Sequence, residues 1–404
     1  MSNDILNKKN KHTMTDLYQM QALPLSAKIR MTQNRINGWV DEFGEDGVYV
    51  SFSGGKDSTV LVDIVRNVCG YKNIPLVFID VPTQYPELKQ FAMTFDNLEI
   101  LKPKISFAEV CEKYGFPLFS KEISECIEYS RKYIKILTDR QTDRQTDRQT
   151  ELPFACCIAD LIGIDRRVNK ENAAYKNLKM GNIPSELMKA PERVKQLFGV
   201  KCDSFGSMYD RSRYLFMLDA PFDVSNQCCK VMKKQPAHEY AKNTGRKPMT
   251  ATMATESKLR TSNWIKHGCN AFESKHPISN PMSFWTEQDV LLYIKENNLP
   301  ICSVYGDVVT DYKSMGQCEN QMSLADYGIF DNERPLLKTT GCSRTGCVLC
   351  GFGCHLEKEP NRFQMLKETH PKFYNLIHIL KNNGVTYAEA IDWINEHGGL
   401  EIKY

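Results

Sequence analysis

At 404 residues the chain is longer than a typical single domain, so we expect one large α/β domain with a smaller subdomain, or two domains. Its 52 lysines and arginines against 49 aspartates and glutamates leave a net charge of +3, too small to indicate a nucleic-acid-binding surface by itself. The N-terminal residues are polar and no apolar stretch is long enough to cross a bilayer, so we expect a cytoplasmic protein without membrane contact.

The first predicted elements form a βαβ unit. Apolar residues recur at helical spacing over 25–43, which predicts an amphipathic helix. Residues 47–53 are rich in β-formers and end in a Ser-Gly-Gly turn, after which Ser58 is a candidate N-cap for a helix over 59–68. Residues 74–80 are typical of a buried parallel strand. We therefore expect an α/β fold with a parallel sheet.

The middle of the chain contains a segment without core character. An insertion near 127–151 includes three TDRQ repeats, and residues 138–150 have no apolar side chain. Acidic and basic residues alternate there in equal number, which is typical of a solvated segment and does not favour a nucleic-acid contact.

Two later helices are predicted from their N-terminal capping signals. Thr286 with Asp289 begins a helix within 285–300, and Thr386 with Glu389 begins another near the C-terminus. We divide the chain into three predicted segments, namely an N-terminal helical segment (1–45), a main α/β domain (46–300) and a cysteine-rich, mostly helical C-terminal subdomain (301–404).

A glycine turn between the first predicted strand and helix is the strongest candidate site. Backbone N–H groups at such a turn, together with the helix dipole, favour an anion. Lys56 and the serines would add donors that stabilise a pyrophosphate leaving group, and Asp57 would hold metal-bound water or order the loop. An ordinary strand-to-helix turn is the alternative. The residues of this turn are Ser53, Gly54, Gly55, Lys56, Asp57 and Ser58.

The turn differs from the G-x-x-x-x-G-K-[ST] pattern and resembles the PP-loop of the ATP pyrophosphatase superfamily, whose members generally cleave between the α and β phosphates. Further segments resemble the adenylyl-sulfate and phosphoadenylyl-sulfate (PAPS) reductase family, in order from about residue 46 to 355. They are FID with QYPE (78–87), Cys228-Cys229 with Lys233, Lys234 and Pro236, Gly245-Arg246 with Glu256-Ser257 and Arg260, and Asn280-Pro281 with Trp285-Thr286-Glu287 and Tyr293-Ile294.

The resemblance implies a fold, a substrate and site residues. It implies an adenine nucleotide alpha hydrolase-like domain that binds ATP or adenylyl sulfate with Mg²⁺, and Asp80 and Glu87 would border the nucleotide. Arg260 would join Lys56 and Asp57 as a catalytic residue. Basic residues at 233, 234 and 246 are candidates to bind sulfate, a second phosphate or a nucleic-acid backbone, although the two lysines are equally compatible with plain surface positions.

Clustered cysteines indicate a metal site. The chain has fifteen cysteines, which the cytoplasm would keep reduced, and four of them fall within the thirteen residues 342–354. Their spacing allows an iron–sulfur cluster or zinc held by Cys342, Cys347, Cys350 and Cys354, or uncoupled reduced thiols. The family resemblance instead implies a 4Fe-4S cluster held by Cys228, Cys229, Cys347 and Cys350. The adjacent pair Cys156-Cys157 is expected to lie in the core.

The chain departs from the reductase pattern at one motif. Reductases of this family attack sulfur with a cysteine in a C-terminal Cys-Gly-Leu-His motif, whereas this sequence ends in GGLEIKY and has no cysteine after Cys354. Cys354 is therefore the candidate nucleophile.

Three functions are compatible with these patterns. The family also contains enzymes that activate a nucleic acid with ATP and introduce sulfur. Because the C-terminal cysteine motif of the reductases is missing here, we favour an ATP-dependent sulfurtransferase that adenylylates its acceptor. Its partners would be a sulfur donor protein and a nucleic-acid acceptor. The alternatives are a sulfonucleotide reductase that produces sulfite, and a non-catalytic nucleotide-sensing or DNA-binding protein.

Overall fold

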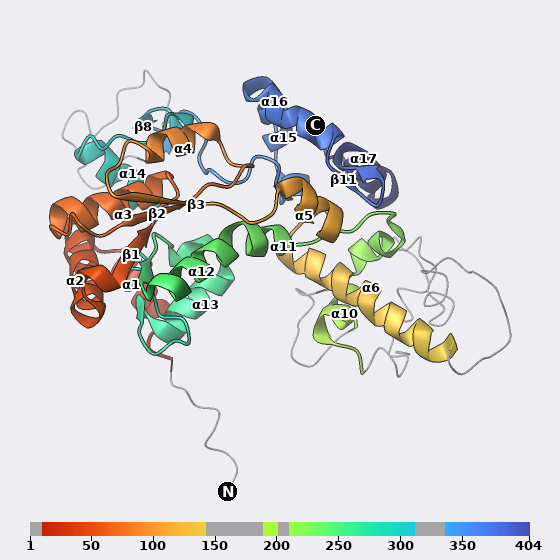
Figure 1. The fold of residues 1–404 in the computed structure, drawn as a ribbon, viewed down its shortest axis with the longest axis horizontal. Coiled ribbons are helices and arrows are strands. Elements are labelled where there is room, and N and C mark those ends of the chain that lie inside the picture. Colours follow the sequence, from red (N-terminus) through yellow and green to blue (C-terminus); the bar gives the residue numbers. More distant parts are fainter. Residues whose placement is uncertain (1–9, 143–188, 201–209, 312–335) are drawn as a thin grey trace, which may run out of the picture. The chain divides into compact units, whose positions relative to one another are not determined.

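The computed structural model describes residues 10–142, 189–200, 210–311 and 336–404 (Figure 1). Internal contacts divide the chain into two compact units that interleave along the sequence. Unit 1 comprises Met1–Pro103 and Gln235–Gly346, and unit 2 comprises Lys104–Lys234 and Cys347–Tyr404. The three predicted segments, with boundaries at 45 and 300, are consecutive in sequence, whereas the two units interleave. The predicted boundaries stay a prediction. Most of the TDRQ repeat and the pair Cys156-Cys157 lie outside the described residues.

Unit 1 is built on a six-stranded sheet in the order β3-β2-β1-β5-β7-β6. All neighbouring strands are parallel except the edge pair β6 and β7. This arrangement confirms the α/β fold with a mostly parallel sheet. The strands are β1 Val48–Ser51, β2 Leu76–Ile79, β3 Leu98–Leu101, β5 Lys247–Met249, β6 Asn270–Ala271 and β7 Ile278–Ser279, and a separate antiparallel pair is formed by β8 Val308–Thr310 and β9 Leu337–Thr339.

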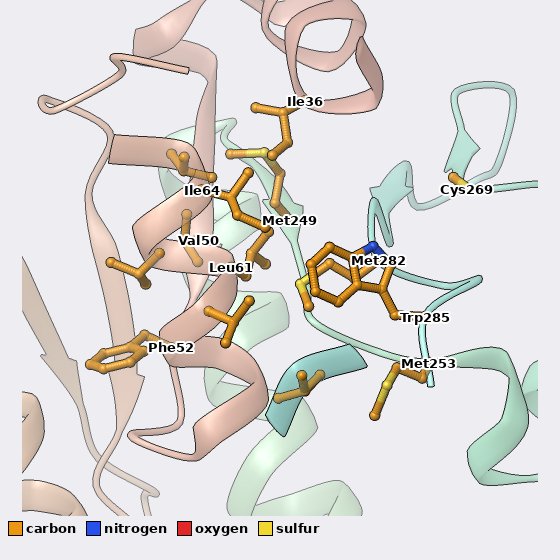
Figure 2. Packing of buried hydrophobic residues seen from close by; sticks show 14 of the residues in the cluster. Ile36, Val50, Phe52, Leu61, Ile64, Met249, Met253, Cys269, Met282 and Trp285 are labelled. Atoms are coloured by element: carbon orange, nitrogen blue, oxygen red, sulfur yellow. The ribbon is translucent and has the colours of Figure 1, made fainter. Parts of the chain in front are cut away.

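The central strand β1 is covered on both faces. Its first three residues are all apolar, and successive side chains of a strand point to opposite faces of the sheet. Val50 packs into the main cluster of buried residues, where Leu61 of α3 and Trp285 also lie (Figure 2). Tyr49 points to the opposite face and packs with Val77 and with Tyr240 of α12. A continuous apolar run therefore marks a strand that is buried between helices.

The helices of unit 1 follow the predicted pattern with one correction. The helix predicted over 25–43 is α2, which ends at Phe43 before Gly44. The helix after the glycine turn was expected to be capped by Ser58 and to begin at residue 59, but it begins three residues earlier, at Lys56, and Gly55 is its N-cap. The helices are α1 Met14–Gln21, α2 Leu25–Phe43, α3 Lys56–Asp63, α4 Pro86–Ala92, α12 Gln235–Thr244, α13 Lys258–His267 and α14 Glu287–Glu296.

Helix α14 is fixed in unit 1 by a carboxylate with two roles. Asp289 accepts the backbone N–H of Thr286 at 2.8 Å, which closes the predicted capping box. The same carboxylate pairs with Lys28 of α2 at 2.6 Å, and both side chains are buried. The first turn of α14 therefore has a defined position against α2, which matters because Glu287 lies in that turn.

Unit 2 is mostly helical and contains only short strand pairs among its described residues. Tyr387 stacks on Phe116 with ring centroids 4.7 Å apart, which joins the C-terminal stretch to the first stretch of the unit. Its described α-helices and strands are α5 Phe107–Tyr114, β4 Leu118–Phe119, α6 Lys121–Thr142, α10 Glu192–Leu197, α11 Gln227–Cys229, β10 Gly351–Phe352, α15 Arg362–Thr369, α16 Pro371–Tyr374, β11 Lys381–Asn382, β12 Val385–Thr386 and α17 Tyr387–Gly398. Within the described ranges, no helix combines the length and the apolar character that crossing a membrane requires.

Candidate functional site

The glycine turn lies at the point in the sheet of unit 1 where the order of the strands reverses. From β1 the chain continues to β2 on one side, whereas the later strand β5 pairs with the other side of β1. In open parallel sheets, ligands bind outside the carboxyl ends of the strands at such a switch point. The residues that follow β1 include Gly54 and Gly55, and those that follow β5 lead into α13. The fold thus brings these two loops to the same edge.

The turn needs glycine at its centre. Gly54 has a φ of +71°, and a Cβ atom on it would lie 2.7 Å from the backbone oxygen of Leu88. Inside the turn, the Ser58 hydroxyl donates to the Gly55 carbonyl at 2.9 Å and lies 3.0 Å from the Ser53 hydroxyl. No side chain caps α3, so the first-turn N–H groups of this helix are not used by a capping residue.

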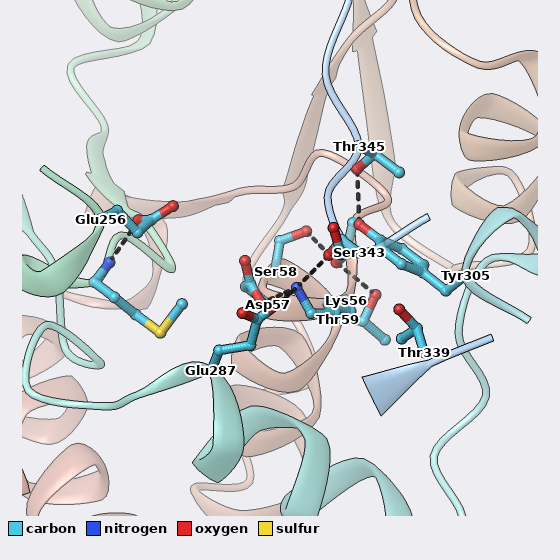
Figure 3. Close-up of polar contacts among 12 residues, drawn as sticks. Lys56, Asp57, Ser58, Thr59, Glu256, Glu287, Tyr305, Thr339, Ser343 and Thr345 are labelled. Atoms are coloured by element: carbon cyan, nitrogen blue, oxygen red, sulfur yellow. Dashed lines mark hydrogen bonds and ion pairs between the residues drawn. The ribbon is translucent and has the colours of Figure 1, made fainter. Parts of the chain in front are cut away.

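Lys56 is buried at this turn, with 2% of its surface exposed. Its Nζ lies 3.4 Å from Asp57 Oδ1, 3.1 Å from Glu287 Oε1 and 3.0 Å from the Ser343 carbonyl (Figure 3). Burial opposes its charged form, but Asp57 and Glu287 outweigh this effect and raise the pKa of Lys56. The site therefore contains a fixed positive charge.

Asp57 is the carboxylate within the glycine turn. Burial raises its pKa, and the opposing effect of Lys56 only partly offsets this. Apart from the ion pair with Lys56, Asp57 Oδ1 has no hydrogen-bond partner among the described residues. A buried oxygen of this kind can accept a ligand-borne donor or a hydrated metal ion.

Arg260 reaches the same neighbourhood from the first turn of α13. Its guanidinium pairs with Glu256, and Ser257 caps the helix by accepting the Arg260 N–H at 3.3 Å. Burial and the nearby charge of Arg344 lower the pKa of Arg260, and Asp57 acts in the opposite direction. The charges of Arg260, Arg344 and Asp57 therefore act on one another, and the catalytic role of Arg260 stays a prediction.

The segment Gly341–Gly346, here called the cover segment, was not predicted to take part in the nucleotide site. It contributes the Ser343 carbonyl to Lys56, and Thr345 Oγ1 lies 2.7 Å from the hydroxyl of Tyr305. From its sequence, this segment was expected to contribute only Cys342, as a candidate metal ligand. Glu287 and Tyr305 were also missed as site residues, because their proximity to Lys56 arises from tertiary packing.

Three other predicted residues have defined partners in unit 1. Asp80 follows β2, and its carboxylate pairs with Lys89 at 2.7 Å. Glu87 lies in the first turn of α4, where its negative charge contributes to the raised pKa of Cys302 after the larger effect of burial. Arg246 binds Glu99 and the Tyr240 hydroxyl at 2.8 and 2.7 Å, which ties β3 to α12. Nucleotide contacts of these residues stay a prediction.

In unit 2, Cys228, Cys229, Cys347 and Cys350 interact with one another, and we call them the cysteine group. A hydrogen bond from Cys228 lowers the pKa of Cys229 against the effect of burial, and Lys121 and Lys233 act in the same direction as the hydrogen bond. The same thiol contact and burial raise the pKa of Cys228. The group therefore favours one thiolate beside cationic side chains.

Lys233 is one of two lysines, with Lys121, that act on the cysteine group. Burial opposes its charge, but the sulfurs of Cys347 and Cys229 and a hydrogen bond to Cys347 raise the pKa of Lys233. The loop that carries Cys347 and Cys350 is itself anchored, because Arg362 Nη1 donates to the Cys350 carbonyl at 2.7 Å and the Tyr387 hydroxyl to the Leu349 carbonyl at 3.2 Å.

The cysteine group matches an iron–sulfur cluster in the kind and number of its donors. Its arrangement is that of thiols hydrogen-bonded to each other and to Lys233. Among the residues that the structure describes, no set of three or more His, Cys, Asp or Glu side chains is arranged to hold a metal ion. Cluster binding by this group accordingly stays a prediction.

The two remaining cysteines of the motif have different surroundings. Cys342 belongs to unit 1, where its Sγ lies 3.7 Å from the Tyr85 hydroxyl. Cys354 belongs to unit 2 and is 2% exposed, and burial raises the pKa of its thiol to about 12. A nucleophile needs an accessible thiolate, so this environment does not favour the predicted catalytic role of Cys354.

A parallel sheet whose central strand leads through a glycine turn into a helix, with a lysine at the turn, defines a PP-loop type of nucleotide-binding fold. Residues 47–144 and 168–351 match the family profile described as the phosphoadenosine phosphosulfate reductase domain. The match covers well over half of the chain, and the chain therefore belongs to the PAPS reductase family, whose members use nucleotide substrates. The matched ranges include the glycine turn and the cysteine group but end before Cys354.

Among solved structures, the chain is similar to phosphoadenylyl-sulfate (PAPS) reductase from Candida auris in its phosphate complex, with 14% sequence identity and a TM-score of 0.32. That similarity covers 72% of this chain and 90% of the other. No curated protein matches the chain.

Proposed function

We propose that this chain is an ATP-using enzyme that adenylylates an acceptor for sulfur transfer. The observation that carries the proposal is the buried Lys56 at the glycine turn, held between Asp57 and Glu287 at the switch point of the sheet. A fixed cation beside the free amides of a helix N-terminus suits a pyrophosphate leaving group.

The proposed reaction has two steps. The turn and Lys56 hold the β and γ phosphates of ATP, which arrive with Mg²⁺, and Asp57 accepts a hydrogen bond from metal-bound water. An acceptor oxygen attacks the α phosphorus, and pyrophosphate leaves with the electron pair of the broken bond. A sulfur nucleophile then displaces AMP from the activated acceptor. Arg260 balances the charge that develops on the α phosphate.

We further propose that the cysteine group binds a 4Fe-4S cluster, with zinc as the alternative occupant. Its four thiols and the neighbouring Lys233 support this assignment, since a cationic side chain stabilises thiolate ligands. When bound, such a cluster would bind or provide the sulfur that the enzyme transfers. The protein's own contribution is to hold the ligand loop through Arg362 and Tyr387. A sulfur donor protein and a nucleic-acid acceptor are the proposed partners.

Reduction of adenylyl sulfate or PAPS to sulfite is the second candidate, and the description of the matched family favours it. Such a reduction needs a thiolate nucleophile. The buried thiol of Cys354 does not meet this need, and therefore the sulfurtransferase ranks first.

The test is pyrophosphate release from ATP in the presence of Mg²⁺, sulfide and either single-stranded DNA or transfer RNA. We expect acceptor-dependent release that falls by at least about 100-fold in Lys56→Ala, since one electrostatic contact to a leaving group is worth roughly 10²–10³ in rate. Lys72→Ala, which changes an exposed lysine of unit 1, is the matched control.

Two results would contradict this function. Wild-type protein that releases no pyrophosphate with either acceptor would remove the sulfurtransferase. Sulfite production from PAPS in the presence of thioredoxin would then establish the reductase in its place. Circular dichroism of Lys56→Ala separates lost chemistry from lost folding, because this substitution leaves two carboxylates without their buried cation.

A further inference from the structure

We propose that Arg344, carried by the cover segment, is a substrate-binding residue that forms with Arg260 a subsite for the adenylyl phosphate of the nucleotide. This inference rests on the proposed function and deepens it, since it assigns a part of the substrate to residues that the glycine turn does not use.

Both neighbours of Arg344 in the chain contact the nucleotide site. The Ser343 carbonyl accepts from Lys56 Nζ at 3.0 Å, and Thr345 Oγ1 lies 2.7 Å from the Tyr305 hydroxyl (Figure 3). A Cβ atom on Gly55 would lie 3.3 Å from Thr345 Oγ1. The backbone of Arg344 is therefore held directly over the glycine turn.

The cover segment has a fixed backbone position. The Gly341 N–H donates to the Tyr305 carbonyl at 2.8 Å, and the Cys342 N–H donates to the Val304 carbonyl at 2.9 Å. A Cβ atom on Gly341 would lie 2.4 Å from the Val304 carbonyl oxygen, so this close approach needs glycine. Arg344 is thus presented by an anchored segment of unit 1.

The charge of Arg344 acts on two residues of the site. It stabilises the carboxylate of Asp57, and it repels the guanidinium of Arg260. The residue is exposed, and none of the ion pairs between described residues includes it, whereas Arg260 pairs with Glu256 and Lys56 pairs with Glu287. Two guanidinium groups that repel each other beside one carboxylate can be bridged by an oxyanion, which guanidinium binds in a bidentate manner.

The positions of the cations indicate which part of the nucleotide each of them would bind. Lys56 and the first-turn amides of α3 suit the pyrophosphate portion, as proposed above. Arg260 and Arg344 are the further cations next to Asp57, so the phosphate that joins adenosine to pyrophosphate is the group that they would contact. AMP, pyrophosphate and adenosine are then probes that report on different residues.

The experiment measures equilibrium binding of AMP, inorganic pyrophosphate and adenosine to the wild type and to Arg344→Ala, Arg344→Lys and Lys56→Ala. We expect Arg344→Ala to weaken AMP binding at least about tenfold, because the variant loses a charge-assisted hydrogen bond to the phosphate. Adenosine binding should not change. Arg344→Lys should restore only part of the loss, since lysine keeps the charge without the bidentate geometry.

The control is Arg30→Ala, which removes an exposed arginine of α2 from the same unit and should leave all three affinities unchanged. If Arg344→Ala binds AMP as tightly as the wild type while Lys56→Ala weakens pyrophosphate binding, the proposed nucleotide site stands and the role of Arg344 is overturned. If Arg344→Ala weakens only pyrophosphate binding, the assignment to the adenylyl phosphate is overturned. If the wild type binds none of the probes, the proposed function itself fails.

Discussion

At the glycine turn, backbone geometry restricts the choice of residue more strongly than side-chain chemistry does. Gly54 has a φ of +71°, and the space next to it is occupied by the Leu88 carbonyl. A left-handed conformation costs an ordinary residue roughly 1–2 kcal/mol before any steric conflict is counted. The turn therefore has a stability cost for every residue but glycine.

We predict that Gly54→Ala lowers the free energy of unfolding by about 1–3 kcal/mol, since strained backbone positions cost this much, and weakens ATP binding. Urea unfolding followed by circular dichroism measures the first effect. The control is Gly38→Ala, which lies within α2 with open space around it and should raise stability by roughly 0.5–1 kcal/mol. Equal stability of the wild type and Gly54→Ala would contradict the strained turn.

The residues of the glycine turn were predictable because they are adjacent in sequence and their chemistry follows from the local strand-to-helix context. The surroundings of Lys56 were not, since Glu287 and Ser343 lie more than two hundred residues away along the chain. Hydrophobic periodicity predicts which face of α14 is buried, but it gives no information about which loop a polar residue on that helix will contact. Arg344 was overlooked because the cysteines around it suggested a metal loop.

At the scale of elements, capping signals were the most informative part of the sequence. Both predicted capping boxes, at Thr286 and at Thr386, are present with the expected partners three residues later. The start of α3 was misplaced because Ser58 is a favourable capping residue, whereas the structure uses its hydroxyl inside the turn. Capping propensity alone could not separate these two uses of a serine.

The N-cap of α17 is expected to contribute to the stability of the protein. Removing the capping hydroxyl with Thr386→Ala should lower stability by about 1 kcal/mol, measured by the midpoint of urea unfolding. Thr369→Ala is the control, because Thr369 is exposed at the C-terminal end of α15 and its hydroxyl contacts only the Met365 carbonyl and the neighbouring His370 ring, with no role in a helix N-cap. Its effect should stay within about 0.5 kcal/mol. Indistinguishable midpoints for the two variants would show that the cap is not formed.

The same cap predicts a dependence on pH. Hydrogen bonds from the backbone N–H and hydroxyl of Thr386 lower the pKa of Glu389. Because the folded-state pKa is depressed, the contribution of this carboxylate is present above the usual glutamate pKa and is lost as the pH falls through the lowered value. Acid titration of the unfolding midpoint should therefore be flatter in Glu389→Gln than in the wild type. A parallel pair of titrations would contradict this cap.

At the scale of the whole molecule, unit 2 brings together cysteines from two distant stretches of chain. If they bind a cluster, Cys228→Ser and Cys347→Ser should each lose iron and acid-labile sulfide when the protein is purified anaerobically, and the thermal unfolding midpoint should fall because a bound cluster links the two stretches. Cys69→Ser, which changes a partly buried thiol of unit 1, is the control. Zinc without sulfide in the wild type would establish the alternative metal, and wild type without either would refute the site.

The interleaving of the units could not be foreseen from the sequence, in which the predicted segments follow one another. Hydrophobic patterns identify elements one at a time, whereas membership of a unit depends on contacts between stretches far apart in the chain. The α/β class was predictable because strands alternate with helices in the first hundred residues. That Cys347 and Cys350 join the cysteine pair on α11 was suggested only by the family resemblance.

Interleaving also sets an order of events during synthesis. Residues 235–346, which complete unit 1, leave the ribosome before the second stretch of unit 2 begins at Cys347. At 5–20 residues per second, the adjacent thiols of Cys228 and Cys229 wait on the order of ten seconds for the loop that completes their group. During this interval the two thiols lack Cys347 and Cys350, the other members of their group. Assembly of any cofactor there is therefore a late step in maturation, after the nucleotide-binding half has had time to fold.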